Sequence, residues 1–233
     1  MYQKIANKLN KLKNPAKAKI LQSFFKTGKG EYGEGDIFLG IVVPEQRKIV
    51  KKYFQEASLP DVQKLLNSKI HEYRLVGILI LVEKFKKAED KLKKEIFDFY
   101  LKNTRNINNW DLVDLSAPHI IGNYLLDKDR KSLYKLAKSK TLWEKRIAIL
   151  ATFAFIREKQ FANTIEISKI LLKESHDLIH KAVGLMLREI GKRDEQELIK
   201  FLDKYTLQMP RTMLRYAIER LPEKKRKYYL GKK

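Results

Sequence analysis

The segment LWEKRIAILATFAFI (142–156) decides the fold class, because its pattern recurs further along the chain. DLIHKAVGLMLREIG (177–191) and RTMLRYAIERL (211–221) also place a basic residue shortly before a small residue and an apolar stripe. The small residues stand 34 and 35 positions apart, at Ala148, Ala182 and Ala217. Apolar stripes of helical period that repeat at this distance are typical of stacked helix pairs. The sequence therefore predicts an all-α fold, a solenoid of HEAT-like helical repeats.

The same pattern extends toward the N-terminus. In NWDLVDLSAPHIIG (109–122), Ser116 precedes Ala148 by 32 positions, and EYRLVGILIL (72–81) is a looser copy. Stacked pairs of this kind curve and give a concave inner face. No linker-like or low-complexity segment divides the chain, so we predict a single HEAT-like repeat domain over 1–233. An ordinary helical bundle with coincidental spacing is the alternative, and the only serious candidate for a strand is 37–43.

The charge of the chain points to a polyanionic partner. Its 233 residues include 50 Lys and Arg against 28 Asp and Glu, a net charge of +22. Residues 1–20 hold six lysines and no acid, and the segments 128–146 and 204–233 are also strongly basic. Such a surplus must face solvent and favours nucleic acid, because neutralising phosphates releases counterions. We therefore expect a basic concave face. The Lys- and Glu-rich composition of heat-adapted proteins is the alternative, but it raises both residue types together.

Several classes of protein are excluded by what the sequence lacks. It contains no cysteine, which rules out disulfides, a thiol nucleophile and Cys-ligated metal sites. Its longest apolar run near the centre, 75–82, is far too short to span a bilayer. The first residues are basic and lack the apolar core of a signal peptide. We therefore expect a soluble cytoplasmic protein, associated with the nucleoid and not with a membrane.

Two short motifs suggest chemistry that their surroundings do not support. Residues 28–33 match GxGxxG, but a basic helical segment precedes them, and nearby acids such as Glu31 would repel phosphate. We interpret this segment as a flexible loop. His176 and His180 share one helical face, but zinc would need a third ligand, and none is obvious nearby. We therefore predict no metal site, with His176 capping a helix or facing solvent where that helix starts.

The most informative stretch is NNWDLVD (108–114). On a helix, Trp110 and Asp114 project from the same face and place an aromatic plane beside a carboxylate. An alkylated purine is positively charged, so the indole can attract it by a cation–π interaction of about 0.5–2 kcal/mol. The carboxylate can stabilise the cationic sugar that forms when the glycosidic bond breaks, or orient the attacking water. The structural alternative has Trp110 as a buried anchor and Asp111 or Asp114 as a charge at a helix start.

At these residues the sequence resembles the DNA alkylation repair family, the AlkD-type DNA glycosylases built from HEAT-like repeats. The similarity covers most of the chain from Phe24 onward and is strongest in FLGIVVPEQRK (38–48), NNWDLVD (108–114), LWEKRIAIL (142–150) and HKAVGLMLREIGK (180–192). The resemblance implies an enzyme that excises positively charged N3- and N7-alkylpurines from duplex DNA and leaves an abasic site. It also implies a site that does not enclose the base in a pocket. We expect the enzyme to hydrolyse the N-glycosidic bond as a monomer, without metal or organic cofactor.

The resemblance also implies roles for individual residues. Asp114 corresponds to the catalytic carboxylate, Trp110 to an aromatic wall against the lesion, and Arg146 to a backbone-binding arginine beside the site. DNA contacts are expected from Arg188, Arg47, Lys181, Leu185 and Phe24. Leu185 stands where the family commonly has a second tryptophan, and Phe24 where it has an aromatic residue with a hydroxyl. These departures favour the alternative of a non-catalytic nucleic-acid-binding protein. A protein-interaction solenoid is a third hypothesis, and the charge of +22 argues against it.

Overall fold

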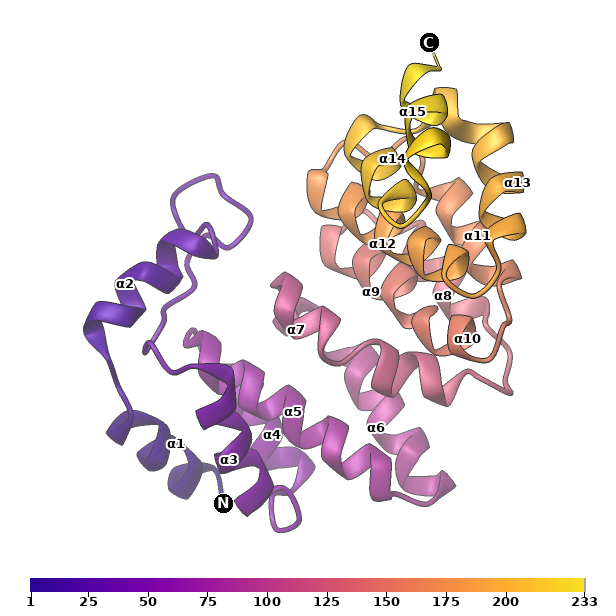
Figure 1. Cartoon of the computed structure of the whole chain (residues 1–233). Coiled ribbons are helices and arrows are strands. Elements are labelled where there is room, and N and C mark those ends of the chain that lie inside the picture. The colour runs from indigo at the N-terminus through magenta and orange to yellow at the C-terminus, as the bar shows by residue number, and fades with distance from the viewer. Residues whose placement is uncertain (233) are drawn as a thin grey trace. The chain divides into compact units, whose positions relative to one another are not determined.

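The computed structural model describes residues 1–232, and their regular structure is helical, which confirms the predicted all-α helical-repeat fold. The chain forms two compact units, one over 1–116 and one from residue 117 onward (Figure 1). Each unit is described by itself below. The single domain and the concave basic face stay predictions. Among the described residues, none of the helices combines the length and the apolar composition that crossing a bilayer requires.

The first unit has seven α-helices and one short 3-10 turn. They are α1 (Tyr2–Lys11), α2 (Pro15–Phe24), α3 (Val43–Tyr53), α4 (Leu59–Leu66), α5 (His71–Lys87), α6 (Asp90–Lys102), η1 (Thr104–Asn106) and α7 (Trp110–Asp114). Local sequence fixes several starts. Asn14 accepts a hydrogen bond from the backbone N–H of Lys17 at the start of α2, and Ser58 and Asp61 form a capping box at α4.

Helix α5 is the centre of the first unit. It packs against both α3 and α4, and its residues 71–82 are all buried. The apolar residues of α5, among them Leu75, Leu79 and Val82, therefore lie in the core together with the polar residues at its start. Burying polar side chains at one end of a helix requires that they pair with one another or with backbone groups. The candidate site is built from those pairs.

The only serious candidate for a strand, 37–43, does not form one. Ile37 makes one isolated bridge to Ile70, and α3 already begins at Val43. The backbone between them is held instead by the Glu72 carboxylate of α5, whose Oε1 and Oε2 accept hydrogen bonds at 2.8–3.1 Å from three successive N–H groups, those of residues 39, 40 and 41. Gly40 allows this path, because it has φ of +84° and a Cβ there would lie 2.2 Å from the carbonyl oxygen of Asn14.

The second unit contains eight α-helices in its described residues, together with a π-helical turn and a 3-10 turn. They are η2 (Pro118–Gly122), α8 (Lys131–Ala137), α9 (Leu142–Ala151), α10 (Phe153–Arg157), α11 (Ala162–Ile170), α12 (Asp177–Gly191), α13 (Glu195–Tyr205), η3 (Thr206–Gln208), α14 (Arg211–Ile218) and α15 (Glu223–Gly231). Helix α12 packs between α9 and α14 (Figure 1). The three small residues that revealed the repeat, Ala148, Ala182 and Ala217, are all buried, one on each of these helices. Small side chains at these positions let neighbouring repeats approach closely.

Candidate functional site

Trp110, the first residue of α7, rests on a stack of aromatic rings. The side chain of Asn109 accepts a hydrogen bond from the Trp110 backbone N–H at 2.8 Å and so caps the helix. The half-buried indole lies flat on the ring of Phe25, with centroids 5.1 Å apart and planes 12° apart. Phe25 stacks on Phe38 at 4.9 Å, and Phe38 stacks on the imidazole of His71 at 4.4 Å. We call these four rings the aromatic stack. It supports one side of the indole with buried side chains.

Phe24 adds an exposed ring beside the aromatic stack. It is the last residue of α2, is 62% exposed, and meets the indole of Trp110 edge-on with centroids 6.1 Å apart. Its neighbour Phe25 points into the core. The structure thus brings together two of the residues that the sequence analysis singled out for DNA contact. A large exposed aromatic ring beside a half-buried indole offers a surface on which a base can stack.

Asp114, the last residue of α7, lies one helical turn after Trp110 on the same side of the helix and is half-buried. Its negative charge interacts with the buried hydroxyl of Tyr100. Burial and this charge both raise the pKa of that hydroxyl. Tyr100 is hydrogen-bonded to Ser116 at 2.8 Å, and Ser116 donates to the carbonyl oxygen of Leu112 at 2.5 Å. These bonds anchor the end of α7 and, with it, the place of Asp114.

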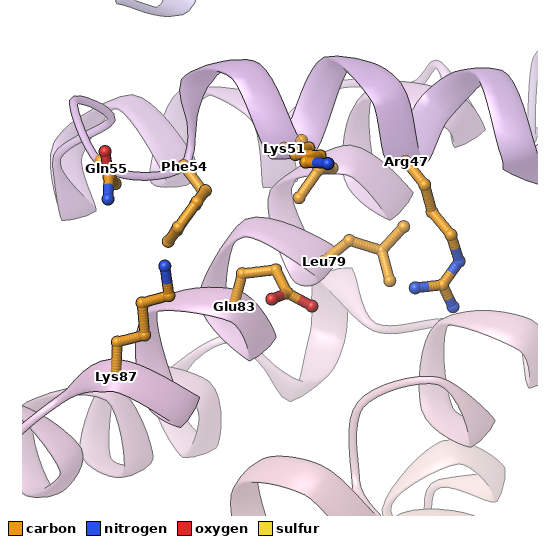
Figure 2. A pocket seen from close by; sticks show the side chains of 8 residues that line it. Arg47, Lys51, Phe54, Gln55, Leu79, Glu83 and Lys87 are labelled. Carbon is orange, nitrogen blue, oxygen red and sulfur yellow. The ribbon is translucent and has the colours of Figure 1, made fainter.

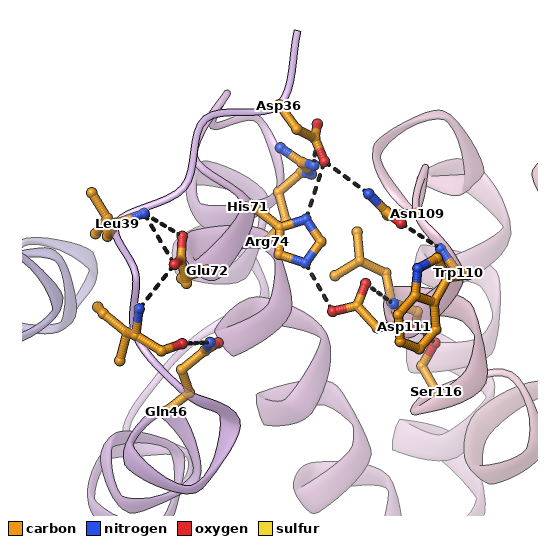
Figure 3. A network of polar contacts seen from close by, with 12 residues as sticks. Asp36, Leu39, Gln46, His71, Glu72, Arg74, Asn109, Trp110, Asp111 and Ser116 are labelled. Atoms are coloured by element: carbon orange, nitrogen blue, oxygen red, sulfur yellow. Dashed lines mark hydrogen bonds and ion pairs between the residues drawn. The ribbon is translucent and has the colours of Figure 1, made fainter. Parts of the chain in front are cut away.

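The start of α7 is anchored by a buried histidine. His71 Nδ1 lies 3.1 Å from Asp36 Oδ2, and His71 Nε2 lies 2.9 Å from Asp111 Oδ2 (Figure 3). Asp36 also accepts hydrogen bonds from Arg74 at 2.6 Å and from Asn109 at 3.2 Å. Asp111 Oδ1 accepts one from the backbone N–H of residue 112 at 2.8 Å. The loop before α3, the start of α5 and the start of α7 are therefore joined by one charged network, formed by Asp36, His71, Arg74, Asn109 and Asp111.

The electrostatics of this network favour a charged imidazole. Burial lowers the pKa of His71, but the charge of Asp111 and the hydrogen bonds to Asp111 and Asp36 outweigh it and raise that pKa to about 8. Burial alone would raise the pKa of Asp36. The hydrogen bond from His71 and the positive charge of Arg74 instead hold that pKa below its usual value. Two buried carboxylates are thus balanced by two buried cations, as burial of charge requires.

Sequence reasoning missed this network. His71 and Arg74 stand in HEYR (71–74), at the start of a segment that was interpreted only as a looser copy of the repeat, and Asp36 was not considered as a partner of either residue. Asp111 was considered as a helix-start charge, and it does occupy the first turn of α7. The available signal was a histidine and an arginine three positions apart at the start of a buried helix, because such a pair needs acidic partners from elsewhere in the chain.

The model of the family described as "DNA alkylation repair enzyme" matches residues 5–221. The chain belongs to the DNA alkylation repair family. A solved structure described as a predicted DNA alkylation repair enzyme from Enterococcus faecalis shares its fold, with a TM-score of 0.70 at 16% sequence identity. The similarity covers 91% of this chain and 97% of that one. No curated protein matches the sequence significantly.

In this member of the DNA alkylation repair family, the predicted site residues of the second unit have partners within that unit. Arg146 of α9 is buried, and its guanidinium donates a hydrogen bond to the carbonyl oxygen of Leu178 at 2.6 Å. On α12, Arg188 forms an ion pair with Glu219, and Lys181 forms one with Asp177 at 2.7 Å. Leu185 of α12 is half-buried. A role for Arg146 in binding the DNA backbone therefore requires that its guanidinium act from a largely buried position.

Arg47 of α3 lines a pocket of 430 Å³ between α3 and α5 (Figure 2). Lys51 and Lys87 add two more cations to its wall, and Glu83 adds one acid. The Lys87 ammonium lies 4.8 Å from the centroid of the Phe54 ring, which also lines the pocket. Arg47 thus belongs to a group of surface cations in the same unit as Trp110 and Asp114.

The two short motifs have structural roles. In the glycine-rich loop, Glu31 accepts a hydrogen bond from the backbone N–H of Gly28 at 2.8 Å, and Glu34 accepts one from Gly30 at 2.8 Å. The loop amides that a phosphate would need are therefore bonded to carboxylates of the loop itself, which agrees with the interpretation as a loop. His176 caps α12 by accepting a hydrogen bond from the backbone N–H of Leu178 at 3.1 Å, as predicted. Within residues 1–232, no three or more His, Cys, Asp or Glu side chains are grouped to hold a metal ion.

Proposed function

We propose that this protein is a DNA glycosylase that excises positively charged N3- and N7-alkylpurines from duplex DNA by hydrolysing the N-glycosidic bond. One observation supports this above all. The indole of Trp110 lies flat on the buried ring of Phe25 and meets the exposed ring of Phe24 edge-on, with the half-buried carboxylate of Asp114 one turn away on the same face of α7. Membership of the DNA alkylation repair family supports the same reaction class.

The charge of the lesion explains why so few side chains suffice. When the bond between C1′ and the purine nitrogen breaks, its electron pair goes to the purine, which leaves as a neutral base. The positive charge moves to the sugar, where the carboxylate of Asp114 stabilises it and water adds to C1′ with loss of a proton, leaving an abasic site. In the ground state, the cationic base is attracted to the face of Trp110 by about 0.5–2 kcal/mol. Phe24 contributes a second stacking surface.

The proposed role of the basic residues is to hold the DNA backbone. Arg47, with Lys51 and Lys87 nearby, is the cation group of the first unit, and Arg188, Lys181 and Arg146 are the proposed contacts of the second. Arg188 and Lys181 would exchange their ion pairs with Glu219 and Asp177 for phosphate. Leu185 is proposed to give apolar contact to the DNA where a tryptophan would stack. The proposed partner is duplex DNA that contains alkylated bases, and the protein acts as a monomer without a cofactor.

Base release under single-turnover conditions tests the proposal. We expect the wild-type protein to release N7-methylguanine from a duplex, and Asp114→Asn to reduce the rate by about 10²–10⁴-fold. Asp90→Asn is the matched control, because the side chain of Asp90 in the same unit is 93% exposed. It should release base at the wild-type rate. Equal rates for the wild type and Asp114→Asn would refute the assignment of Asp114.

The alternative, a non-catalytic DNA-binding protein, is favoured by Leu185 in place of an aromatic residue and by the buried position of Arg146. It predicts binding to DNA without release of base above background. Binding should weaken with salt, with a slope of log K against log salt of about −0.9 for each phosphate neutralised. Tight, salt-dependent binding together with no release would therefore replace the glycosylase proposal by this one.

A further inference from the structure

His71 is a buried titratable group that the proposed reaction does not use. It is 1% exposed and stacks on Phe38, with Phe25 against it at 5.1 Å. Each ring nitrogen faces an oxygen of a different carboxylate, that of Asp36 or that of Asp111. An ionised carboxylate oxygen only accepts hydrogen bonds, so both nitrogens must carry a proton for both bonds to exist. With Asp36 and Asp111 both ionised, the geometry therefore requires an imidazolium.

We propose that His71, as an imidazolium held between Asp36 and Asp111, is a positioning residue that fixes the start of α7 and thereby the indole of Trp110. Asp111 directly follows Trp110, and the same histidine supports the far end of the aromatic stack on which that indole lies. The position of Trp110 thus depends on the protonation of His71 in two ways. One is the contact of His71 with the carboxylate of Asp111, and the other is the aromatic stack that joins His71 to the indole. For the consequence on base excision, the inference rests on the proposed function.

Loss of a proton from the His71 imidazolium should break the contact between His71 and Asp111. The charged groups that face His71 are Asp36 from the loop before α3, Asp111 from α7, and Arg74 from its own helix. Asp36 stays bound to Arg74 and Asn109, whereas Asp111 is held to the backbone N–H of residue 112, which belongs to α7 itself. A neutral imidazole would present a lone pair to one carboxylate. The repulsion is relieved most easily where fewer bonds from other elements oppose it, which is at Asp111.

The emission of Trp110 reports this coupling without any catalysis. In a Trp143→Phe background, Trp110 is the remaining tryptophan. Its fluorescence is expected to change as pH rises from about 6 to about 9, in step with the pKa of His71, which lies at about 8. His71→Gln, whose amide does not titrate in this range, should abolish the transition. His180→Gln is the matched control, because His180 bonds to the carbonyl oxygen of Glu174 in the second unit, and it should leave the transition in place.

Asp111→Asn provides a second variant that keeps the inference testable if His71→Gln does not fold. The amide can still accept a hydrogen bond from His71 but removes the charge that most raises its pKa. The midpoint of the fluorescence transition should therefore move to lower pH. A wild-type emission that stays constant over this range, or a midpoint that Asp111→Asn leaves unchanged, would overturn the inference.

Excision kinetics then test the consequence for the reaction. One pH unit above the pKa of His71, the single-turnover rate should be about tenfold below its plateau, because about one molecule in ten retains the proton. The Kd for undamaged duplex should not follow the same curve, because the imidazole is buried. His71→Gln should remove this alkaline limb. A rate without an alkaline limb in the wild type would overturn the link to excision. If no protein variant releases base at any pH, the proposed function fails, while the emission experiment still decides the inference.

Discussion

The ring of Phe25 lies flat against the indole of Trp110, with planes 12° apart, while Phe25 itself is 7% exposed. A residue of the core and a residue of the candidate site therefore share one contact surface. Phe24, the neighbour of Phe25 in the chain, is exposed and meets the same indole edge-on. Buried Phe25 therefore stabilises the site, whereas exposed Phe24 is available to a ligand.

Substitution of the two phenylalanines should affect different properties: that of Phe25 the stability of the fold, and that of Phe24 the binding of DNA. Phe25→Ala removes the central ring of the aromatic stack, so we expect the free energy of unfolding in urea to fall by about 3–5 kcal/mol. Phe24→Ala removes an exposed ring, and the change in unfolding free energy should stay within about 0.5 kcal/mol. Binding of lesion-containing duplex should weaken in Phe24→Ala by about 1–3 kcal/mol, the usual contribution of one stacked base. Equal loss of stability in both variants would contradict the division between core and surface.

The stability of the protein should depend on pH through His71. Its pKa is raised in the folded state from 6.5 to about 8, so its contribution is fully present below the unfolded value of 6.5. As pH rises through the folded value, about 2 kcal/mol of unfolding free energy should be lost. Urea denaturation at pH values on either side of this window measures the loss. His71→Gln should lack it, and a wild-type protein equally stable at both pH values would contradict the protonated network.

Gly184 in the KAVG segment of α12 should tolerate no side chain. A Cβ there would lie 2.5 Å from the carbonyl oxygen of Met213 and 2.5 Å from the Cβ of Tyr216, both on α14. Gly184→Ala must push α12 and α14 apart, so we expect a loss of about 1–3 kcal/mol in unfolding free energy. Gly231→Ala is the matched control, because a Cβ at that position would meet nothing within 4 Å. Thermal unfolding of the two variants gives the comparison, and equal melting temperatures would refute the close helix contact.

The repeat was predictable because small residues at a fixed spacing can be recognised in the sequence itself. The structure buries all three of them, Ala148, Ala182 and Ala217, as helices packed closely in a repeat require. The candidate strand over 37–43 does not form, and the sequence of that apolar run does not show that its N–H groups are taken by a carboxylate. Glu72, which takes them, stands more than thirty positions away.

The candidate site was predictable where its residues are neighbours in the chain and not where they come from separate elements. The helical spacing of Trp110 and Asp114 is a local property, and α7 does place both on one side. The aromatic stack joins Phe25, Phe38, His71 and Trp110 from four segments, so no local pattern contains it. The burial of Arg146 was also missed, because an arginine that bonds to a carbonyl and one that faces solvent look alike in a sequence.

The length of α7, five residues, has a practical consequence for protein engineering. A helix this short does not persist by itself in water, so a peptide carrying NNWDLVD would be unstructured. Grafting that heptapeptide onto another helical scaffold would transfer the sequence of the motif without the contacts that position its side chains. A successful transplant would have to carry the acidic loop residue Asp36 and the histidine of the neighbouring helix with it.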